Sequence, residues 1–251
     1  MKQLINNWLN NNRLFNLNTF KQAVFVQNCL LCDAPQASIH AVCRPCLNDL
    51  PWQPKTSCPQ CGLSSSGQLC GSCISAPPDF DITHSVFLYE FPIDKMMQRY
   101  KYGSSLNIGD TFGRFLAEKI KLDVLNNNNV DLIIPMPMHP QRLKERGFNQ
   151  ALEIAKVLSR LLTKKSREKL DFKSVARQTL TPPQASLPLK QRVKNIKGAF
   201  KVNAELKGKR IAIVDDVMTT GASLNELAKT LKKAGAAHVE CWVIARTLPH
   251  K

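Results

Sequence analysis

Eight of the nine cysteines fall in closely spaced pairs between residues 29 and 73, and this pattern could bind metal. Within each pair two residues separate the cysteines, a spacing that lets both thiolates reach one ion. We expect a cytoplasmic protein, in which disulfides are rare, so metal ligands are the first interpretation. The pairs are Cys29 and Cys32, Cys43 and Cys46, Cys58 and Cys61, and Cys70 and Cys73. The sequence therefore predicts two zinc ions.

Two ligand assignments fit this spacing. Sequential pairing gives one ion to the four cysteines of residues 29–46 and the other to the four of residues 58–73, whereas an interleaved arrangement would exchange pairs between the ions. Neither assignment leaves a ligand position for water, so we expect structural zinc rather than catalytic zinc. Four thiolates on each ion also make this region more negative, which favours partner docking over an electrostatic grip on nucleic acid.

A second pattern of chemical interest is Arg210–Ser223, RIAIVDDVMTTGAS. An apolar strand ends in Asp215 and Asp216, and a Thr- and Gly-rich loop then opens a helix. Ligands of parallel sheets bind beyond the carboxyl ends of strands, and the N-terminus of a helix favours phosphate. The two carboxylates suit vicinal sugar hydroxyls, with a divalent cation to offset their charge. We therefore expect a sugar phosphate here; a turn with acidic helix caps is the alternative.

Alternating strands and helices must position this loop. Short apolar runs predict strands, amphipathic periods predict helices, and Asn149 is the expected N-cap of the second helix. The strands are expected at 85–89, 131–135, 210–214 and 238–245, and the helices at 108–121, from 150 and at 223–234. Such alternation predicts an α/β fold with a mostly parallel sheet and right-handed crossovers.

The chain also divides by composition. We expect an N-terminal extension at 1–27, a small Cys-rich zinc-binding domain at 28–76, a Pro-rich linker at 75–81 and the α/β domain at 81–251. Residues 172–200 show poor periodicity, which is typical of a lid or a binding loop.

The net charge is +16, and residues 142–201 hold 16 basic against 4 acidic side chains. This local excess predicts a polyanionic partner, with nucleic acid the first candidate. Hydrophobic residues make up 43% of the chain, which is typical of a globular protein. No apolar run approaches the roughly 18 residues that a membrane helix needs, and the N-terminus lacks the pattern of a signal peptide. We expect a cytoplasmic protein without membrane insertion.

Together these motifs carry a family resemblance. VDDVMTTGAS (214–223) resembles the phosphoribosyl-pyrophosphate motif of type I phosphoribosyltransferases. PMPMH (135–139) stands where that family has its pyrophosphate loop, and the basic segment 172–200 stands where it has a hood. With the cysteine pairs, this combination is similar to the ComF/GntX family of competence-associated proteins over residues 28–248.

The resemblance implies a phosphoribosyltransferase type I fold behind a double zinc ribbon. It also implies a role in handling imported single-stranded DNA, and binding of phosphoribosyl pyrophosphate with Mg²⁺. By this likeness Asp215 and Asp216 would accept the ribose hydroxyls. The 5′-phosphate would lie against Thr219, Thr220, Gly221, Ala222 and Ser223, and the pyrophosphate against Pro137, Met138, His139 and Arg142.

Basic side chains near these loops are the candidate DNA contacts: Arg142, Lys144, Arg146, Arg177, Arg192, Lys194 and Lys197. Lys144 fits a solvated helix entry equally well, and His139 could be a turn residue. In the hood, Gln184 and Asn195 are further candidates. The segment 99–102 (RYKY) suits stacking on single strands, but Tyr100, Tyr102 and Phe148 fit core packing at least as well.

Three functions remain open at this point. The first, which we favour, is a DNA-uptake protein of natural transformation, or of DNA use as a nutrient, with an intact ligand site. The second is an active phosphoribosyltransferase with an unknown acceptor. The third is a metabolite-sensing regulatory module whose zinc domain docks a partner, with other DNA-uptake proteins as the candidates. The sequence assigns no catalytic residue.

Overall fold

The computed structural model describes residues 28–35, 38, 40–103, 105–124, 130–162, 169–180 and 195–249. Contacts divide the chain into two compact units, Met1–Asp49 and Leu50–Lys251. This division falls between the two groups of cysteines, inside the segment that we expected to be one zinc domain. The second group of cysteines therefore shares a compact unit with the α/β elements.

The described part of the first unit is a short turn followed by the helix α3 (Arg44–Asn48). Two backbone hydrogen bonds close the turn, from Cys29 N to Ala34 O at 2.8 Å and from Leu30 N to Ala41 O at 2.9 Å. Val42 is buried beside them. So few apolar residues give little burial, and such a unit depends on bound metal for its stability.

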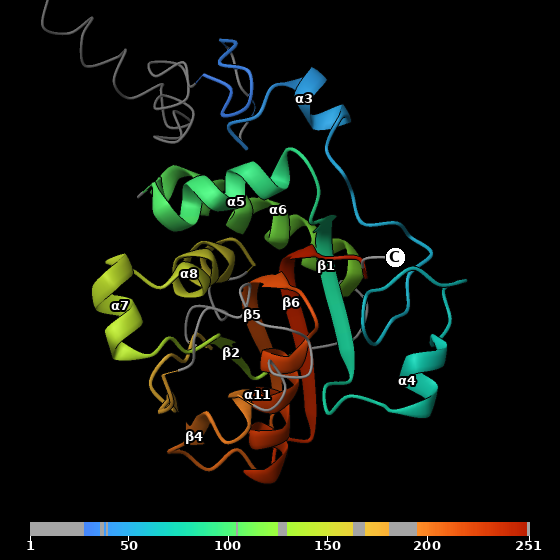
Figure 1. Ribbon diagram of the computed structural model, residues 1–251, viewed down its shortest axis with the longest axis vertical. Helices are drawn as coiled ribbons and strands as arrows, with labels where there is room; N and C mark the ends of the chain where they lie inside the picture. The colour runs from blue at the N-terminus through green and yellow to red at the C-terminus, as the bar shows by residue number, and fades with distance from the viewer. Residues whose placement is uncertain are drawn as a thin grey trace, which may run out of the picture. The chain divides into compact units, whose positions relative to one another are not determined.

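The second unit contains a parallel sheet of four strands in the order β1-β6-β5-β2 (Figure 1). Their bounds are β1 Ile82–Leu88, β2 Leu132–Pro135, β5 Arg210–Met218 and β6 His238–Arg246. Each neighbouring pair is parallel. The central strands β5 and β6 are buried on both faces, which is why they read as continuous apolar runs. All four predicted strands and the parallel sheet are confirmed.

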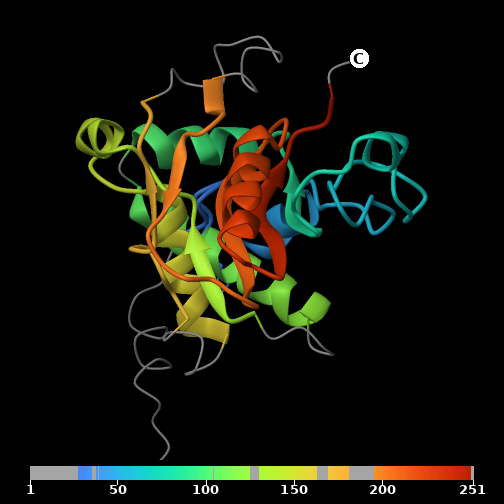
Figure 2. The same cartoon turned by 90° about the horizontal axis from the view of Figure 1, so that it is seen from below.

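Helices cover both faces of this sheet (Figures 1 and 2). The helices α6 (Leu106–Val124) and α8 (Gln150–Leu162) pack together and against β1, β2 and β5. Gly113 permits their close approach, because a Cβ there would lie 2.5 Å from Val157 Cβ. The helix α11 (Ala222–Lys233) buries its apolar side against β5 and β6. Asn149 caps α8 as expected, since its Oδ1 accepts from Leu152 N at 3.3 Å.

Sequence patterns missed the shorter elements. These are α4 (Gly71–Ser75), α5 (Ile93–Tyr102), α7 (Pro140–Arg146), and the antiparallel pair β3 (Val175–Arg177) and β4 (Phe200–Val202). The strand β3 lies within the segment of poor periodicity and β4 begins at its last residue; residues 181–194 are outside the described part of the chain.

Within the Pro-rich segment 75–81, residues 75–77 are exposed, whereas residues 79–81 pack against the α/β elements. Phe80 is buried in the core. Asp79 N donates to Asn225 Oδ1 on α11 at 2.6 Å, and Asp81 N donates to Val239 O on β6 at 2.8 Å. Among the described residues, no helix is long and apolar enough to cross a membrane.

Candidate functional site

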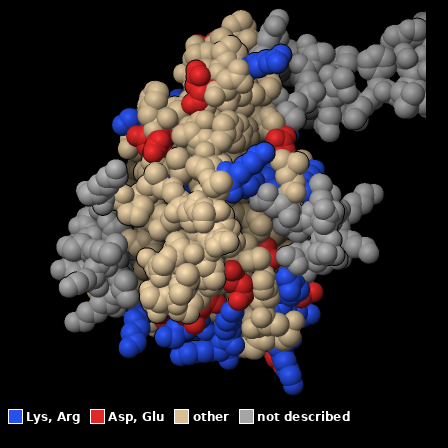
Figure 3. Space-filling view, turned by 90° about the vertical axis from the view of Figure 1, so that its right-hand side faces the viewer, with Lys and Arg blue, Asp and Glu red and all other residues tan. Residues whose placement is uncertain are grey.

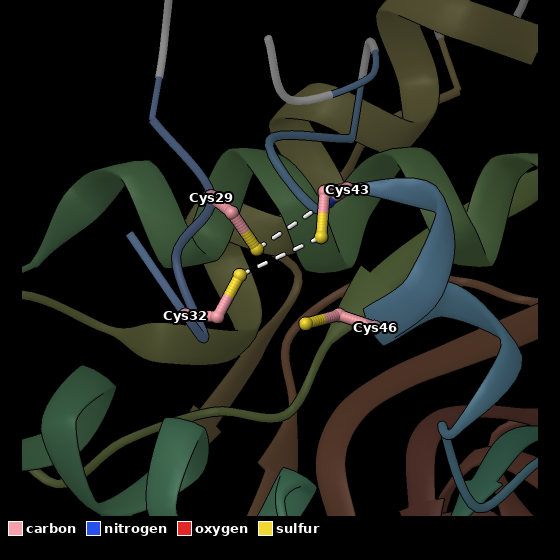
Figure 4. A group of neighbouring side chains, drawn as sticks. All are labelled: Cys29, Cys32, Cys43 and Cys46. Carbon is pink, nitrogen blue, oxygen red and sulfur yellow. Dashed lines mark hydrogen bonds between the residues drawn. The ribbon is translucent and has the colours of Figure 1, made fainter. Parts of the chain in front are cut away.

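The first cysteine cluster brings Cys29, Cys32, Cys43 and Cys46 together (Figure 4). Their four sulfur atoms point toward one another and lie within 4.8 Å, with Cys32 Sγ at 3.6 Å from Cys43 Sγ. Cys43 N also donates to Cys29 Sγ at 3.3 Å. Burial raises the pKa of Cys29, but such backbone N–H donors outweigh it and lower the pKa to about 6. A convergent tetrathiolate with a stabilised anion fits zinc.

The second cluster repeats this geometry with Cys58, Cys61, Cys70 and Cys73. Cys61 Sγ lies 3.6 Å from Cys70 Sγ, and Cys70 N donates to Cys58 Sγ at 3.4 Å. The pKa of Cys58 is raised by burial, yet backbone donors lower it to about 7. The two clusters follow the sequential assignment, so the interleaved alternative is wrong. Each set of four thiolates would hold one zinc ion.

A cavity of about 330 Å³ lies at the carboxyl edge of the sheet. The residues that follow β1, β2 and β5 meet there because parallel strands end at the same edge. Its lining includes Tyr89 after β1, Met136, Pro137 and Met138 after β2, and Asp215, Asp216 and Val217 at the end of β5. Asn149 fixes the second of these loops, since its Nδ2 donates to Met136 O at 3.1 Å.

The two aspartates face this cavity together with a lysine that the sequence analysis did not assign to the site. Lys101 Nζ, from the end of α5, lies 2.8 Å from Asp216 Oδ2, and the two side chains are 23% and 13% exposed. Burial and the charge of Asp216 raise the pKa of Asp215 to about 7. Lys101 and Arg177 oppose that rise because their positive charges favour the carboxylate. Lys101 therefore supplies a positive charge beside both Asp215 and Asp216.

The loop after β5 leads into the N-terminus of α11. Gly221, the N-cap residue, has φ +78°, a left-handed conformation that favours glycine. Thr220 Oγ1 accepts from Ala222 N at 3.2 Å. The first N–H groups of a helix have no intrahelical acceptor, so they can bind an anion. Thr219 and Ser223 line the cavity on this side.

Two arginines add positive charge to the cavity wall, Arg146 from α7 and Arg177 from β3. Arg146 Cζ lies 5.9 Å from the ring centroid of Tyr102, which is 77% exposed and also lines the cavity. Arg177 Cζ lies 5.7 Å from the ring centroid of Phe200. Burial lowers the pKa of Arg177 from its ordinary value, and Asp215 partly offsets this.

The other predicted site residues lie in different places. His139 caps α7, where its Nδ1 accepts from Gln141 N at 3.2 Å. Arg142 pairs with Glu145 at 3.0 Å on the same helix. Lys144 and Lys197 are exposed. None of these four lines the described cavity. Gln184, Arg192 and Lys194 are outside the described residues.

The aromatic residues of the candidate stacking segment have separate roles. Tyr100 is buried, its ring centroid lies 5.5 Å from that of Phe148, and its hydroxyl donates to Gln150 O at 2.9 Å. Core packing is therefore confirmed for Tyr100 and Phe148. Tyr102 is exposed at the cavity. The sequence signal for Lys101 was its position between two tyrosines, and that pattern specified no acidic partner.

Exposed lysines also gather away from this cavity. In Figure 3 several basic side chains lie at the lower end of the face shown, the end where Figure 1 places β4 and α11, and others lie nearer its middle. The exposed lysines of β4, of α11 and of the residues between β4 and β5 are Lys201, Lys207, Lys209, Lys229 and Lys233. The positive charge of the protein is therefore not confined to residues 142–201.

Comparisons with known proteins agree with this architecture. Residues 112–249 match the phosphoribosyl transferase domain family, and residues 20–74 match the double zinc ribbon domain family. A purine phosphoribosyltransferase structure from Pyrococcus horikoshii shares 18% identity, covers 65% of this chain and 87% of its own, and has a TM-score of 0.30.

Two curated relatives are similar over most of the chain. DNA utilization protein YhgH of Escherichia coli O6:H1 is 34% identical over 229 residues, which are 88% of this chain and 97% of that protein. Competence protein F of Haemophilus influenzae is 34% identical over 197 residues, which are 75% of this chain and 84% of that protein. The chain, which joins a double zinc ribbon to a phosphoribosyltransferase domain, therefore belongs to the ComF/GntX family.

Proposed function

We propose that this protein is a cytoplasmic DNA-uptake protein that handles imported single-stranded DNA and binds phosphoribosyl pyrophosphate with Mg²⁺. The observation that carries the ligand part is the cavity in which two adjacent carboxylates, three cations and a helix N-terminus face the same space. A phosphorylated pentose has hydroxyls for the carboxylates and anionic groups for the rest. The names of the relatives support the DNA part.

Each side of the cavity suits one part of the ligand. Asp215 and Asp216 would accept hydrogen bonds from the ribose hydroxyls, and the loop from Thr219 to Ser223 would hold the 5′-phosphate. Arg146 and Arg177 would face the pyrophosphate, because one guanidinium group can donate two parallel hydrogen bonds to a phosphate group. Magnesium would enter with the pyrophosphate as part of the ligand.

Positive charge on the outer surface would hold the DNA backbone. Arg142, Lys144 and Arg146 follow one another on α7, beside the cavity that Arg146 lines. Neutralising phosphates releases counterions, so affinity should fall as salt rises. The tetrathiolate zinc sites would add little to this binding, and the zinc ribbon would instead dock other DNA-uptake proteins.

Calorimetry tests the ligand part. Phosphoribosyl pyrophosphate with Mg²⁺ should bind the wild-type protein, and Asp216→Asn should weaken binding by about tenfold, since one charged hydrogen bond is lost. Asp110→Asn is the matched control, because Asp110 lies on α6 and does not line the cavity. No binding to the wild-type protein would contradict the proposal.

A titration of single-stranded oligonucleotide tests the DNA part. Replacing Arg142, Lys144 and Arg146 with alanine should weaken binding by about tenfold or more and reduce its salt dependence. The control replaces Lys207, Lys209 and Lys233, which removes the same charge from the other basic cluster. Equal losses in the two variants would show a non-specific charge effect and contradict a DNA site on α7.

A phosphoribosyl transfer reaction in the same cavity is the second candidate. Arg146 and Arg177 line the part of the cavity where pyrophosphate would leave, and such cations stabilise a departing anion. Release of pyrophosphate in the presence of bases, nucleotides or DNA would support it. Binding of the ligand without release under any of these conditions would contradict it.

A further inference from the structure

Arg246 joins the second cysteine cluster to the loop after β5. It ends β6 and is only 4% exposed. Its Nε donates to Cys61 O at 2.8 Å, and its Nη1 donates to Met218 O at 2.9 Å and to Thr219 O. One guanidinium therefore touches a carbonyl of a zinc-ligand residue and the two carbonyls at the start of the loop.

The first of these contacts depends on the fold of the second cluster. Gly62, which follows Cys61, has φ +72°, and a Cβ there would lie 3.7 Å from Arg246 Cγ and Cδ. The neighbouring carbonyls are fixed to β1, because Thr83 N donates to Pro59 O at 2.9 Å and Thr83 Oγ1 donates to Gln60 O at 2.6 Å. Bound zinc would hold this turn in the conformation that presents Cys61 O to Arg246.

The second set of contacts orients the loop itself. A trans peptide unit is planar, so its C=O and N–H point in opposite directions. Hydrogen bonds to Met218 O and Thr219 O therefore fix the directions of the N–H groups of Thr219 and Thr220. Thr219 lines the cavity, and Thr220 precedes the N-cap of α11. Arg246 acts behind the loop and is not among the residues that line the cavity.

We propose that Arg246 is a positioning residue. Through it, zinc at the second cluster holds the loop after β5, residues 219–223, in the conformation that binds phosphate. The first cluster belongs to the other compact unit and therefore serves as the control. The effect on ligand affinity rests on the proposed function, whereas the effect on loop conformation does not.

Two matched variants of the full-length protein test this link. Cys70→Ser with Cys73→Ser removes zinc from the second cluster, and Cys32→Ser with Cys46→Ser removes it from the first. Hydrogen exchange without ligand should show the Thr219 and Thr220 amides exchanging about tenfold faster in the second-cluster variant only. The amides of Ile211 and Ile213 in β5 should keep their protection and thereby report that the unit is folded.

Arg246→Met removes the hydrogen bonds to Cys61 O and to the loop while zinc stays bound. This variant therefore still tests the proposal if the second-cluster variant unfolds and its β5 amides lose their protection. Its loop amides should exchange about tenfold faster, and Arg246→Lys should restore part of the protection by keeping a donor. Loop exchange that is unchanged in Arg246→Met would overturn the proposal. Zinc content should stay at the wild-type level in both Arg246 variants.

Ligand titration separates this inference from the proposed function. Phosphoribosyl pyrophosphate with Mg²⁺ should bind about tenfold more weakly to Arg246→Met and to the second-cluster variant, and equally well to the first-cluster variant. If wild-type protein binds no ligand but loop exchange still accelerates, the proposed function fails and the link stands. If wild-type protein binds and all variants bind equally, the link fails and the proposed function stands.

Discussion

Lys101 Nζ lies 2.8 Å from Asp216 Oδ2 at the wall of the cavity, so the carboxylate pair has a cation of its own. Burial lowers the pKa of Lys101, but the facing Asp216 carboxylate outweighs it and raises the pKa above its ordinary value. The lysine is therefore charged throughout the physiological range. It offsets the repulsion between Asp215 and Asp216, and between them and an incoming phosphorylated ligand.

Replacing Lys101 with methionine should weaken phosphoribosyl pyrophosphate binding by about tenfold and make it more dependent on Mg²⁺. Without the lysine, the added divalent cation must offset a larger share of the carboxylate charge. Calorimetry across a series of Mg²⁺ concentrations measures both effects. Lys95→Met is the control, because Lys95 lies on the same helix but is 61% exposed and pairs with Asp94. Equal Mg²⁺ dependence in the two variants would contradict this role.

Ligand affinity should rise between pH 6 and pH 8. Asp215 has a pKa of about 7, and its deprotonated form is the better acceptor for ribose hydroxyls. The rise should approach about tenfold, because one proton must leave before binding. Calorimetry in buffers of different ionisation enthalpy would detect that proton. Asp215→Asn should abolish the rise, and a rise that persists in this variant would assign it to another group.

Protein stability should change with pH in the opposite direction. Unfolded Asp215 titrates near its ordinary value of about 3.9, so between that pH and 7 the folded state holds a proton that the unfolded state has released. Stability from this group is therefore full below pH 4 and is lost as pH rises toward 7. Asp215→Asn should raise the unfolding free energy at pH 8 by about 1 kcal/mol or more in urea titrations. Asp110→Asn on α6, whose partly exposed side chain pairs with Arg114, should change it by less than about 0.5 kcal/mol.

Zinc analysis should give two ions per chain for the wild-type protein and one for each double cysteine variant. This follows from two separate groups of four sulfur atoms. Measurement of metal content after dialysis checks the number. Loss of both zinc ions from either double cysteine variant would contradict the prediction that the two sites bind zinc independently.

Gly113→Ala should destabilise the second unit by about 1–3 kcal/mol, because the new methyl group would overlap Val157 between α6 and α8. Urea unfolding measures this loss. Gly71→Ala is the control, since a Cβ there meets nothing within 4 Å. Equal stability of the two variants would show that the helices can separate without cost.

Local sequence patterns predicted the parts of this protein whose chemistry is contiguous. The cysteine pairs and the β5–α11 loop each lie in one short segment, so spacing was sufficient to find them. Lys101 and Arg246 act through partners more than 25 residues away along the chain, and their roles depend on the packing of α5 and of the second cluster. No period or spacing encodes such contacts. The charge pattern suggested DNA contacts for Arg142 and Lys144 but could not show which cations face the cavity.

The central claim is that the carboxyl end of β5 binds a phosphorylated pentose. A crystal structure with phosphoribosyl pyrophosphate and Mg²⁺ tests it most directly. We expect ribose hydroxyls within hydrogen-bonding distance of Asp215 and Asp216, with the 5′-phosphate against the backbone of Thr219–Ser223. Density for the ligand elsewhere on the protein, or a ligand in the cavity whose ribose hydroxyls contact neither aspartate, would contradict it.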